Sequence, residues 1–217
     1  LFKNFNASVG FFAYNYSDIG WKLWPGIDVS YLIDSSTKIF ASAGRAFRIP
    51  TYTELYYRSP AQMGNPELKH EETTNYEIGI SYSAFEYQIT GSVFYKEGKN
   101  IIDWVRASAN DVWTVRNETE LNTTGIEAGI IIFPQSFIKW LPVVNFGINY
   151  TYLSLDRSTS GFQSRYSLDH LRHQLIISAA NNLPWELKQN WTFRYENRES
   201  YEDNFVADTQ VLKEFKY

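Results

Sequence analysis

The feature that most constrains this chain is a repeated alternation of apolar and polar side chains. In 75–83 the apolar residues occupy every second position, namely Tyr76, Ile78, Ile80 and Tyr82. Because successive side chains of a strand point to opposite faces of its sheet, this pattern predicts a strand with one apolar face. A second run of the same kind, 86–96, follows after a short break, so the pair predicts a β-hairpin.

The alternation recurs along most of the chain. It is clear in 23–33, 120–132, 143–152 and 187–195, and weaker in 5–14, 37–47, 166–180 and 205–217. No run approaches the roughly 18 apolar residues of a membrane-spanning helix, whereas most of these runs are near the ~9–11 residues of a tilted spanning strand. We therefore expect an all-β fold, an antiparallel up-and-down meander of about ten strands.

The expected connections alternate in length. The shorter breaks are 34–37, 84–86, 133–142 and 181–186, and the longer, polar ones are 15–22, 47–73, 97–118, 156–165 and 197–204. Outer-membrane barrels have short turns on one side and long loops on the other, and aromatic residues where the apolar band ends, as Tyr87 and Tyr95 do here. A soluble all-β module that binds a ligand or carbohydrate would share the alternation, so the pattern alone leaves both alternatives open.

Composition excludes several classes of function. The chain has no cysteine, which rules out disulfide frameworks, Cys-rich zinc sites and thiol catalysis. Its net charge is -4, and no basic run marks a nucleic-acid partner. His170 and His173 fall on opposite faces of a strand, so no metal site is expected. No nucleophile–base pair or nucleotide motif is present, and we expect neither an enzyme nor a cofactor.

The stretch 41–79 carries three motifs in a fixed order. The first contains Phe47, Arg48, Pro50, Thr51, Glu54, Leu55 and Tyr56; the second contains Gly64, Asn65, Pro66, Leu68 and Glu71 or Glu72; the third contains Glu77 and Gly79. This stretch resembles the barrel of TonB-dependent outer-membrane receptors, where a strand ends in F-R-x-P-[ST]-x-x-E-L-Y. In that family a loop with G-N-P-x-L-x-x-E follows, and the next strand carries E-x-G.

Further matches follow in order. The segment 91–104 looks like the family's strand with an aromatic pair, and 122–130, with Gly125 and Glu127, resembles its Asn…Gly-Ile-Glu strand. The segments 166–178 and 183–198 are similar to later strands of cobalamin-receptor-like members. The resemblance implies that 1–217 is a partial barrel domain, the C-terminal part of a transmembrane barrel of about 22 strands, with the plug domain and the final strands absent.

The resemblance also implies a function and a set of partners. It implies an outer-membrane receptor of a Gram-negative bacterium that imports a scarce nutrient, such as a metal chelate (siderophore) or cobalamin, with energy from TonB. The implied partners are outer-membrane lipid, the receptor's own plug domain and remaining barrel strands, the TonB complex acting through the plug, and the small nutrient.

Two sets of residues are candidates for a site. Tyr52, Tyr56 and Tyr57 lie on the first long loop, and Trp104 and Trp113 flank the second. If these loops face outward, their rings could stack on the nutrient; packing within the loops or the aromatic girdle is the alternative.

The second set is charged or forms turns. Arg45, Arg48 and Glu54 either form a network that orders the long loop or are solvated charges at a strand end. Pro50 suits a loop because proline cannot donate to a strand ladder. Gly64-Asn65-Pro66 is a turn signal with a structural role.

Overall fold

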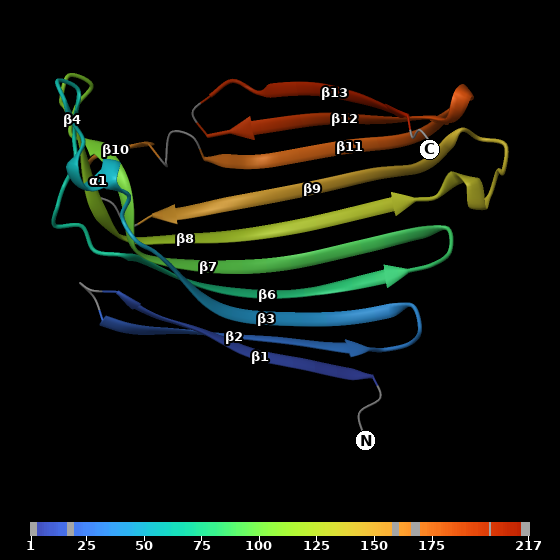
Figure 1. Cartoon of the computed structure of the whole chain (residues 1–217), viewed down its shortest axis with the longest axis horizontal. Helices are drawn as coiled ribbons and strands as arrows, with labels where there is room; N and C mark the ends of the chain where they lie inside the picture. The colour runs from blue at the N-terminus through green and yellow to red at the C-terminus, as the bar shows by residue number, and fades with distance from the viewer. Residues whose placement is uncertain (1–3, 17–19, 158–160, 166–169, 200, 214–217) are drawn as a thin grey trace.

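The computed structural model describes residues 4–16, 20–157, 161–165, 170–199 and 201–213. Within them, ten long strands form one antiparallel meander, drawn side by side in Figure 1. They are β1 (Phe5–Tyr16), β2 (Gly20–Leu32), β3 (Thr37–Arg48), β6 (Glu71–Ser83), β7 (Tyr87–Arg106), β8 (Trp113–Ile132), β9 (Val143–Arg157), β11 (Leu171–Leu183), β12 (Leu187–Arg198) and β13 (Asn204–Lys213). The predicted all-β meander of about ten strands is confirmed.

The remaining elements are short and lie in connections. They are the helix α1 (Tyr52–Tyr56), the two-residue strands β4 (Arg58–Ser59), β5 (Gln62–Met63) and β10 (Gln163–Ser164), and the 3-10 turns η1 (Pro134–Ser136) and η2 (Pro184–Glu186). Among the described residues, no helix is long and apolar enough to cross a membrane. In that same part of the chain, β1 pairs only with β2 and β13 only with β12, so the sheet is open at both edges.

The predicted alternation in length holds only in part: at one end of the sheet 33–36, 84–86 and 184–186 are short turns, but 133–142 at that end is longer than 107–112 at the opposite end. At the other end, α1, β4 and β10 gather into a cluster on the left of Figure 1. Two connections are shorter than predicted. The segment 97–118 is mostly strand, which leaves only 107–112 between β7 and β8, and 15–22 is mostly the ends of β1 and β2.

These strand ends have a physical explanation. Beyond the apolar band backbone pairing continues, but alternation no longer marks the strands, because in 97–118 apolar side chains such as Ile102 and Val105 are buried on both faces. Of the predicted strand 166–180, residues 166–169 lie outside the described residues; of 205–217, the same holds for 214–217.

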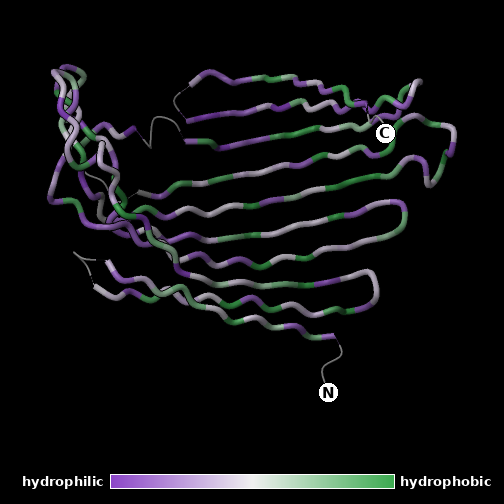
Figure 2. The backbone as a smooth tube through the Cα atoms, viewed as in Figure 1, coloured by the Kyte–Doolittle hydropathy of each residue, from purple (hydrophilic) through white to green (hydrophobic). Residues whose placement is uncertain are grey.

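The strand register gathers the apolar residues on one face. Ile78 pairs with Ala41 on one side and with Val93 on the other, and Val93 pairs with Ile126. These side chains remain open, with Ile78 59% exposed, so no second layer of the described chain covers them. Figure 2 shows the resulting short apolar and polar stretches that alternate along the strands. A broad exposed apolar face is what a lipid-facing wall requires.

Aromatic rings mark both ends of this apolar face. Tyr76 pairs with Tyr95 near the long-loop end, and Tyr82 stacks on Tyr87 near the short turns with ring centroids 5.7 Å apart. Six residues separate Tyr76 from Tyr82, which is about 20 Å of strand. Because strands of such barrels tilt by about 35–45°, this length spans roughly 15 Å of the ~25 Å height of the lipid-facing band.

The opposite face is polar, and on it two phenylalanine rings lie over glycines of the neighbouring strands. Phe40 pairs with Gly79, and Phe94 pairs with Gly125. A Cβ added at Gly79 or Gly125 would overlap the facing phenylalanine ring, so each glycine provides the space in which that ring lies. Glycine at these positions therefore has a packing role rather than a turn role.

Candidate functional site

The loop layer, defined here as 49–70, 100–117 and 161–165, lies at the long-loop end of the sheet. Of the five buried apolar side chains in the described part of the chain, four belong to it, namely Ile101, Ile102, Val105 and Val115. The loop layer therefore has a small core, built on the loop ends of β7 and β8, and the fifth buried apolar residue is Trp24 of β2. Burial of these apolar side chains helps to hold the loops in one arrangement.

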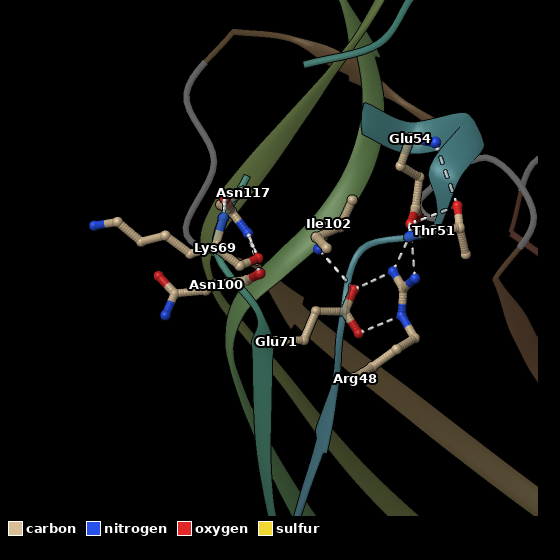
Figure 3. A network of polar contacts seen from close by, with 8 residues as sticks. All are labelled: Arg48, Thr51, Glu54, Lys69, Glu71, Asn100, Ile102 and Asn117. Carbon is tan, nitrogen blue, oxygen red and sulfur yellow. Dashed lines mark hydrogen bonds and ion pairs between the residues drawn. The ribbon is translucent and has the colours of Figure 1, made fainter. Parts of the chain in front are cut away.

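Arg48, the last residue of β3, lies between two carboxylates (Figure 3). Its Nη1 and Nη2 donate to Glu54 Oε2 and Oε1 at 2.9 and 3.0 Å, and its Nε and Nη2 donate to Glu71 Oε2 and Oε1 at 2.8 and 2.6 Å. These bonds raise the pKa of Arg48 further above its usual range, with Glu71 as the larger cause. Glu71 Oε1 also accepts from the backbone N–H of Ile102 at 2.7 Å. One guanidinium thus ties the loop to β6 and, through Glu71, to β7.

Glu54 also caps the helix in which it lies. The Thr51 hydroxyl accepts from the Glu54 N–H at 3.3 Å, and Glu54 Oε2 accepts from the Thr51 N–H at 2.7 Å, which forms a capping box. Burial opposes ionisation of Glu54, but the hydrogen bonds from Arg48 and Thr51 outweigh it and hold the pKa of the carboxyl below its usual value. Glu54 is therefore an anion that orders both α1 and the loop.

The Gly64-Asn65-Pro66 segment folds back onto α1. The Gly64 N–H donates to the Tyr57 carbonyl at 2.7 Å, and the Asn65 N–H donates to the Glu54 carbonyl at 2.8 Å. A Cβ at Gly64 would lie 2.8 Å from the Glu54 carbonyl oxygen, so only glycine fits this close approach. Pro50 and Pro66 lie outside the strands, in the same loop.

The side-chain amide of Asn117 forms a second polar clamp on the loop, in addition to Arg48, and this clamp was not predicted from the sequence. Asn117 Oδ1 accepts from the Lys69 N–H at 2.8 Å, while its Nδ2 donates to the carbonyls of Lys69 at 2.9 Å and Asn100 at 2.6 Å. These bonds join the loop to both β7 and β8. Asn100 has a φ of 54°, a left-handed conformation that asparagine tolerates better than most residues.

Two connecting loops also clasp the β7–β8 hairpin from opposite sides. The β4–β5 pair comes from the loop after β3 and adds to β8 in parallel, whereas β10 comes from the loop after β9 and adds to β7. The resulting strand order in the loop layer is β10-β7-β8-β5-β4. On the β10 side, the Ser164 hydroxyl donates a hydrogen bond to the buried Asp103 carboxylate.

The aromatic candidates fall into two groups. Tyr52 is 79% exposed and lies 4.9 Å from the ring of Tyr56, and Tyr57 is also exposed. Trp104 and Trp113 are half-buried and both lie against the Arg165 guanidinium. The structure therefore brings the two tryptophans together but does not place them in contact with the tyrosines.

The other predicted residues lie apart from these groups. Phe47 stacks on the buried Trp24 with ring centroids 3.7 Å apart, where β2 and β3 stop pairing. Arg45 makes no ion pair or hydrogen bond with Glu54 in the described part of the chain, so the charged network contains Glu71 instead. Glu77 and Glu127 line a hollow of about 280 Å³ on the polar face of the sheet. No group of three potential metal ligands occurs among the described residues.

The lipid-type apolar face, the aromatic borders and the long loops at one end define a class of protein, the wall of a large outer-membrane β-barrel. Residues 2–213 match the TonB dependent receptor-like β-barrel family. The chain belongs to this family of transporters and receptors, whose members lie in the outer membrane of Gram-negative bacteria. The family decides between the two all-β alternatives in favour of the barrel.

Individual relatives support the assignment. The chain is 36% identical over 103 residues to the vitamin B12 transporter BtuB of Photobacterium profundum, an alignment that covers 45% of this chain and 16% of that protein. It is also 36% identical over 108 residues to BtuB of Vibrio vulnificus, covering 49% of this chain and 16% of the relative. The siderophore receptor PirA of Pseudomonas aeruginosa shares the fold, with a TM-score of 0.69 and 17% identity over 98% of this chain and 37% of PirA. The chain thus spans less than half the length of these proteins.

Proposed function

We propose that this chain supplies part of the wall and the outer loops of a receptor that imports a scarce nutrient, such as a metal chelate or cobalamin, with energy from TonB. The observation that carries the proposal is the loop layer. It has a buried core and two polar clamps, and it lies at one end of a wall that is apolar on one face and polar on the other. A rigid loop layer at the mouth of a barrel provides fixed positions for side chains that contact a ligand.

The exposed aromatic residues are the proposed ligand contacts. Tyr52, Tyr56 and Tyr57 lie on α1 or directly after it, and Trp104 and Trp113 lie on the clasped hairpin. Rings held on such elements lose little conformational entropy when they stack on a ligand.

The polar face is the proposed docking surface for the plug domain. Glu77 and Glu127 face this side, and neither forms an ion pair with a described residue. Carboxylates of this kind suit basic side chains of a domain inside the barrel, which would neutralise them. In the full-length receptor, E77Q and E127Q should speed amide exchange in the plug. E67Q, at an exposed loop position, should leave plug exchange unchanged.

Transport is tested with the full-length protein. The receptor is expressed in a Gram-negative host that lacks its own nutrient receptors, in paired strains with and without TonB. Uptake of radiolabelled cyanocobalamin and of ferric chelates is then measured. We expect at least one nutrient to accumulate only when both the receptor and TonB are present. Equal uptake without TonB, or no uptake of any nutrient, would contradict the proposal.

A further inference from the structure

Two arginines of the loop layer are stacked on its two tryptophans. The Arg106 guanidinium lies 4.4 Å from the ring centre of Trp113, and the Arg165 guanidinium lies 4.9 Å from Trp113 and 5.6 Å from Trp104. A separate pair, Arg116 of β8 and Phe162, has its guanidinium 4.9 Å from the ring centre. Two cations and two rings therefore meet where β10 joins the β7–β8 hairpin, whereas Arg116 pairs in register with Asp103 on the opposite face of these strands.

These cations lack the anions that neutralise other arginines of the chain. Arg48 and Arg172 pair with carboxylates, whereas Arg106 and Arg165 form no ion pair with any residue that the structure describes. The buried Asp103 accepts from Ser164, and Asp111 at the hairpin tip is exposed. Two like charges held against one ring repel each other, and a bound anion would remove that cost.

The geometry also holds the guanidiniums in place and leaves N–H groups available to bind an anion. Arg106 Nε donates to Gln163 Oε1 at 2.9 Å and its Nη1 donates to the Ala109 carbonyl at 2.8 Å, so its plane is held on the Trp113 ring. A guanidinium stacked on an aromatic face keeps the remaining N–H groups at its edge free for an anion in its plane. Arg165 is exposed and makes only ring contacts among the described residues, which leaves its edge open to solvent.

The register indicates which side of the wall this cluster serves. Trp104 and Arg106 occupy the same alternate positions of β7 as Ser92 and Lys96, and the β7–β8 pairing keeps one register across the intervening residues. They therefore continue the polar face rather than the lipid-facing one. A dissolved ligand at the barrel mouth fits this position better than a lipid headgroup of the outer leaflet.

We infer that the Arg106–Trp113–Arg165–Trp104 cluster binds an anionic group of the imported nutrient, such as the carboxylate or phenolate oxygens of an iron chelate. The inference rests on the proposed transport function and makes it more specific, because it favours an anionic cargo over a neutral one. The rings add stacking area for a planar part of the ligand, and the arginines supply the charge-assisted hydrogen bonds.

The test is ligand binding to the full-length receptor in detergent, followed by tryptophan fluorescence. The probes are ferric citrate, a ferric tris-catecholate and cyanocobalamin, which is neutral overall. We expect an anionic chelate to bind, and R106Q and R165Q each to raise its Kd by about 10-fold or more. The affinity should also fall with added salt. R58Q, which removes one exposed cation from the same loop layer, should keep the wild-type Kd.

Other outcomes separate this inference from the proposed function. If an anionic chelate binds but R106Q and R165Q match R58Q, the cluster is not its site and the inference is wrong. If only cyanocobalamin binds and is imported with TonB, the inference is wrong and the transport function stands. If no probe binds and no nutrient is imported, both are wrong. Because Arg165 is exposed, R165Q should leave the fold intact, so its Kd for the anionic chelate tests the inference even if R106Q disturbs the hairpin.

Discussion

Replacement of Arg48 by glutamine removes the cation that two partly buried carboxylates share. The side chains of Glu54 and Glu71 are 14% and 11% exposed, and Arg48 makes four N–H···O contacts with them at 2.6–3.0 Å. A hydrogen bond to a charged group contributes about 1.5–3 kcal/mol. The four contacts form one unit, and Arg48 is itself 36% exposed, so solvent screens part of the interaction. We therefore expect R48Q to weaken the attachment of the loop by about 3 kcal/mol.

The effect should be local and is best measured by amide hydrogen exchange on the full-length receptor. The reporters are the N–H groups of Leu55, Gly64 and Asn65, which donate to backbone carbonyls within the loop. A loss of about 3 kcal/mol in local stability speeds their exchange roughly 150-fold. Amides in the middle of β6, such as that of Ile78, should keep their wild-type rates because the sheet pairing there does not involve Arg48.

Arg45 provides the matched control. It lies on the same strand, three residues away, and R45Q removes the same charge without touching Glu54 or Glu71. The reasoning is refuted if R48Q and R45Q give the same loop exchange rates. It is also refuted if R48Q speeds exchange uniformly along β6, since Arg48 would then stabilise the sheet rather than the loop.

Three further predictions concern the loop and the wall. Exchange protection of the loop should be full above about pH 4.5 and should fall as the pH drops through the lowered pKa of Glu54. The reason is that Glu54 binds a proton more readily when the loop is released from Arg48. E54Q should abolish this loss of protection at acid pH. G64A should destabilise the loop by about 1–3 kcal/mol, because its Cβ meets backbone, whereas G10A, with open space around it, should not. G125A should destabilise the barrel in urea unfolding by a similar ~1–3 kcal/mol, and F94A should relieve most of that loss in the double variant.

Each of these has a clear contrary result. If the loss of protection at acid pH persists in E54Q, a group other than Glu54 causes it. Equal effects of G64A and G10A would mean that the close approach of Gly64 to α1 does not matter. Additive losses in G125A and F94A would show that the ring and the glycine are not coupled.

The alternation made much of the wall predictable. The pattern in 75–83 gave the strand, its faces and its partner, because one-sided burial demands a period of two residues. The same argument failed at 97–118, where β7 and β8 continue. The apolar residues there, such as Ile102 and Val115, are buried by loops that approach from both sides, so they follow no single-face pattern.

The site was less predictable because its contacts join distant parts of the chain. The sequence indicated Arg48 and Glu54 as a network with Arg45, and it named Glu71 or Glu72 only as the glutamate of the second motif; the pairing of Arg48 with Glu71 across β3 and β6 brings Glu71 into the network. The bonds of Asn117 to Lys69, and the contact of Arg165 with Trp113, span about fifty residues each and leave no local signal. The ligand-binding roles of the tyrosines and tryptophans remain predictions.

Site-directed labelling tests the central claim that one face of this sheet meets lipid and the other faces the barrel interior. This chain has no cysteine, so single cysteines at Ile78, Val93 and Ile126 can be compared with Ser81, Thr90 and Ser92 in full-length receptor whose other segments are freed of cysteine, held in outer membranes. We predict that a fluorophore at the first three positions is quenched by lipid-borne quenchers and that one at the last three is not. Equal quenching in the two sets, or quenching only at the serine and threonine positions, would contradict the account.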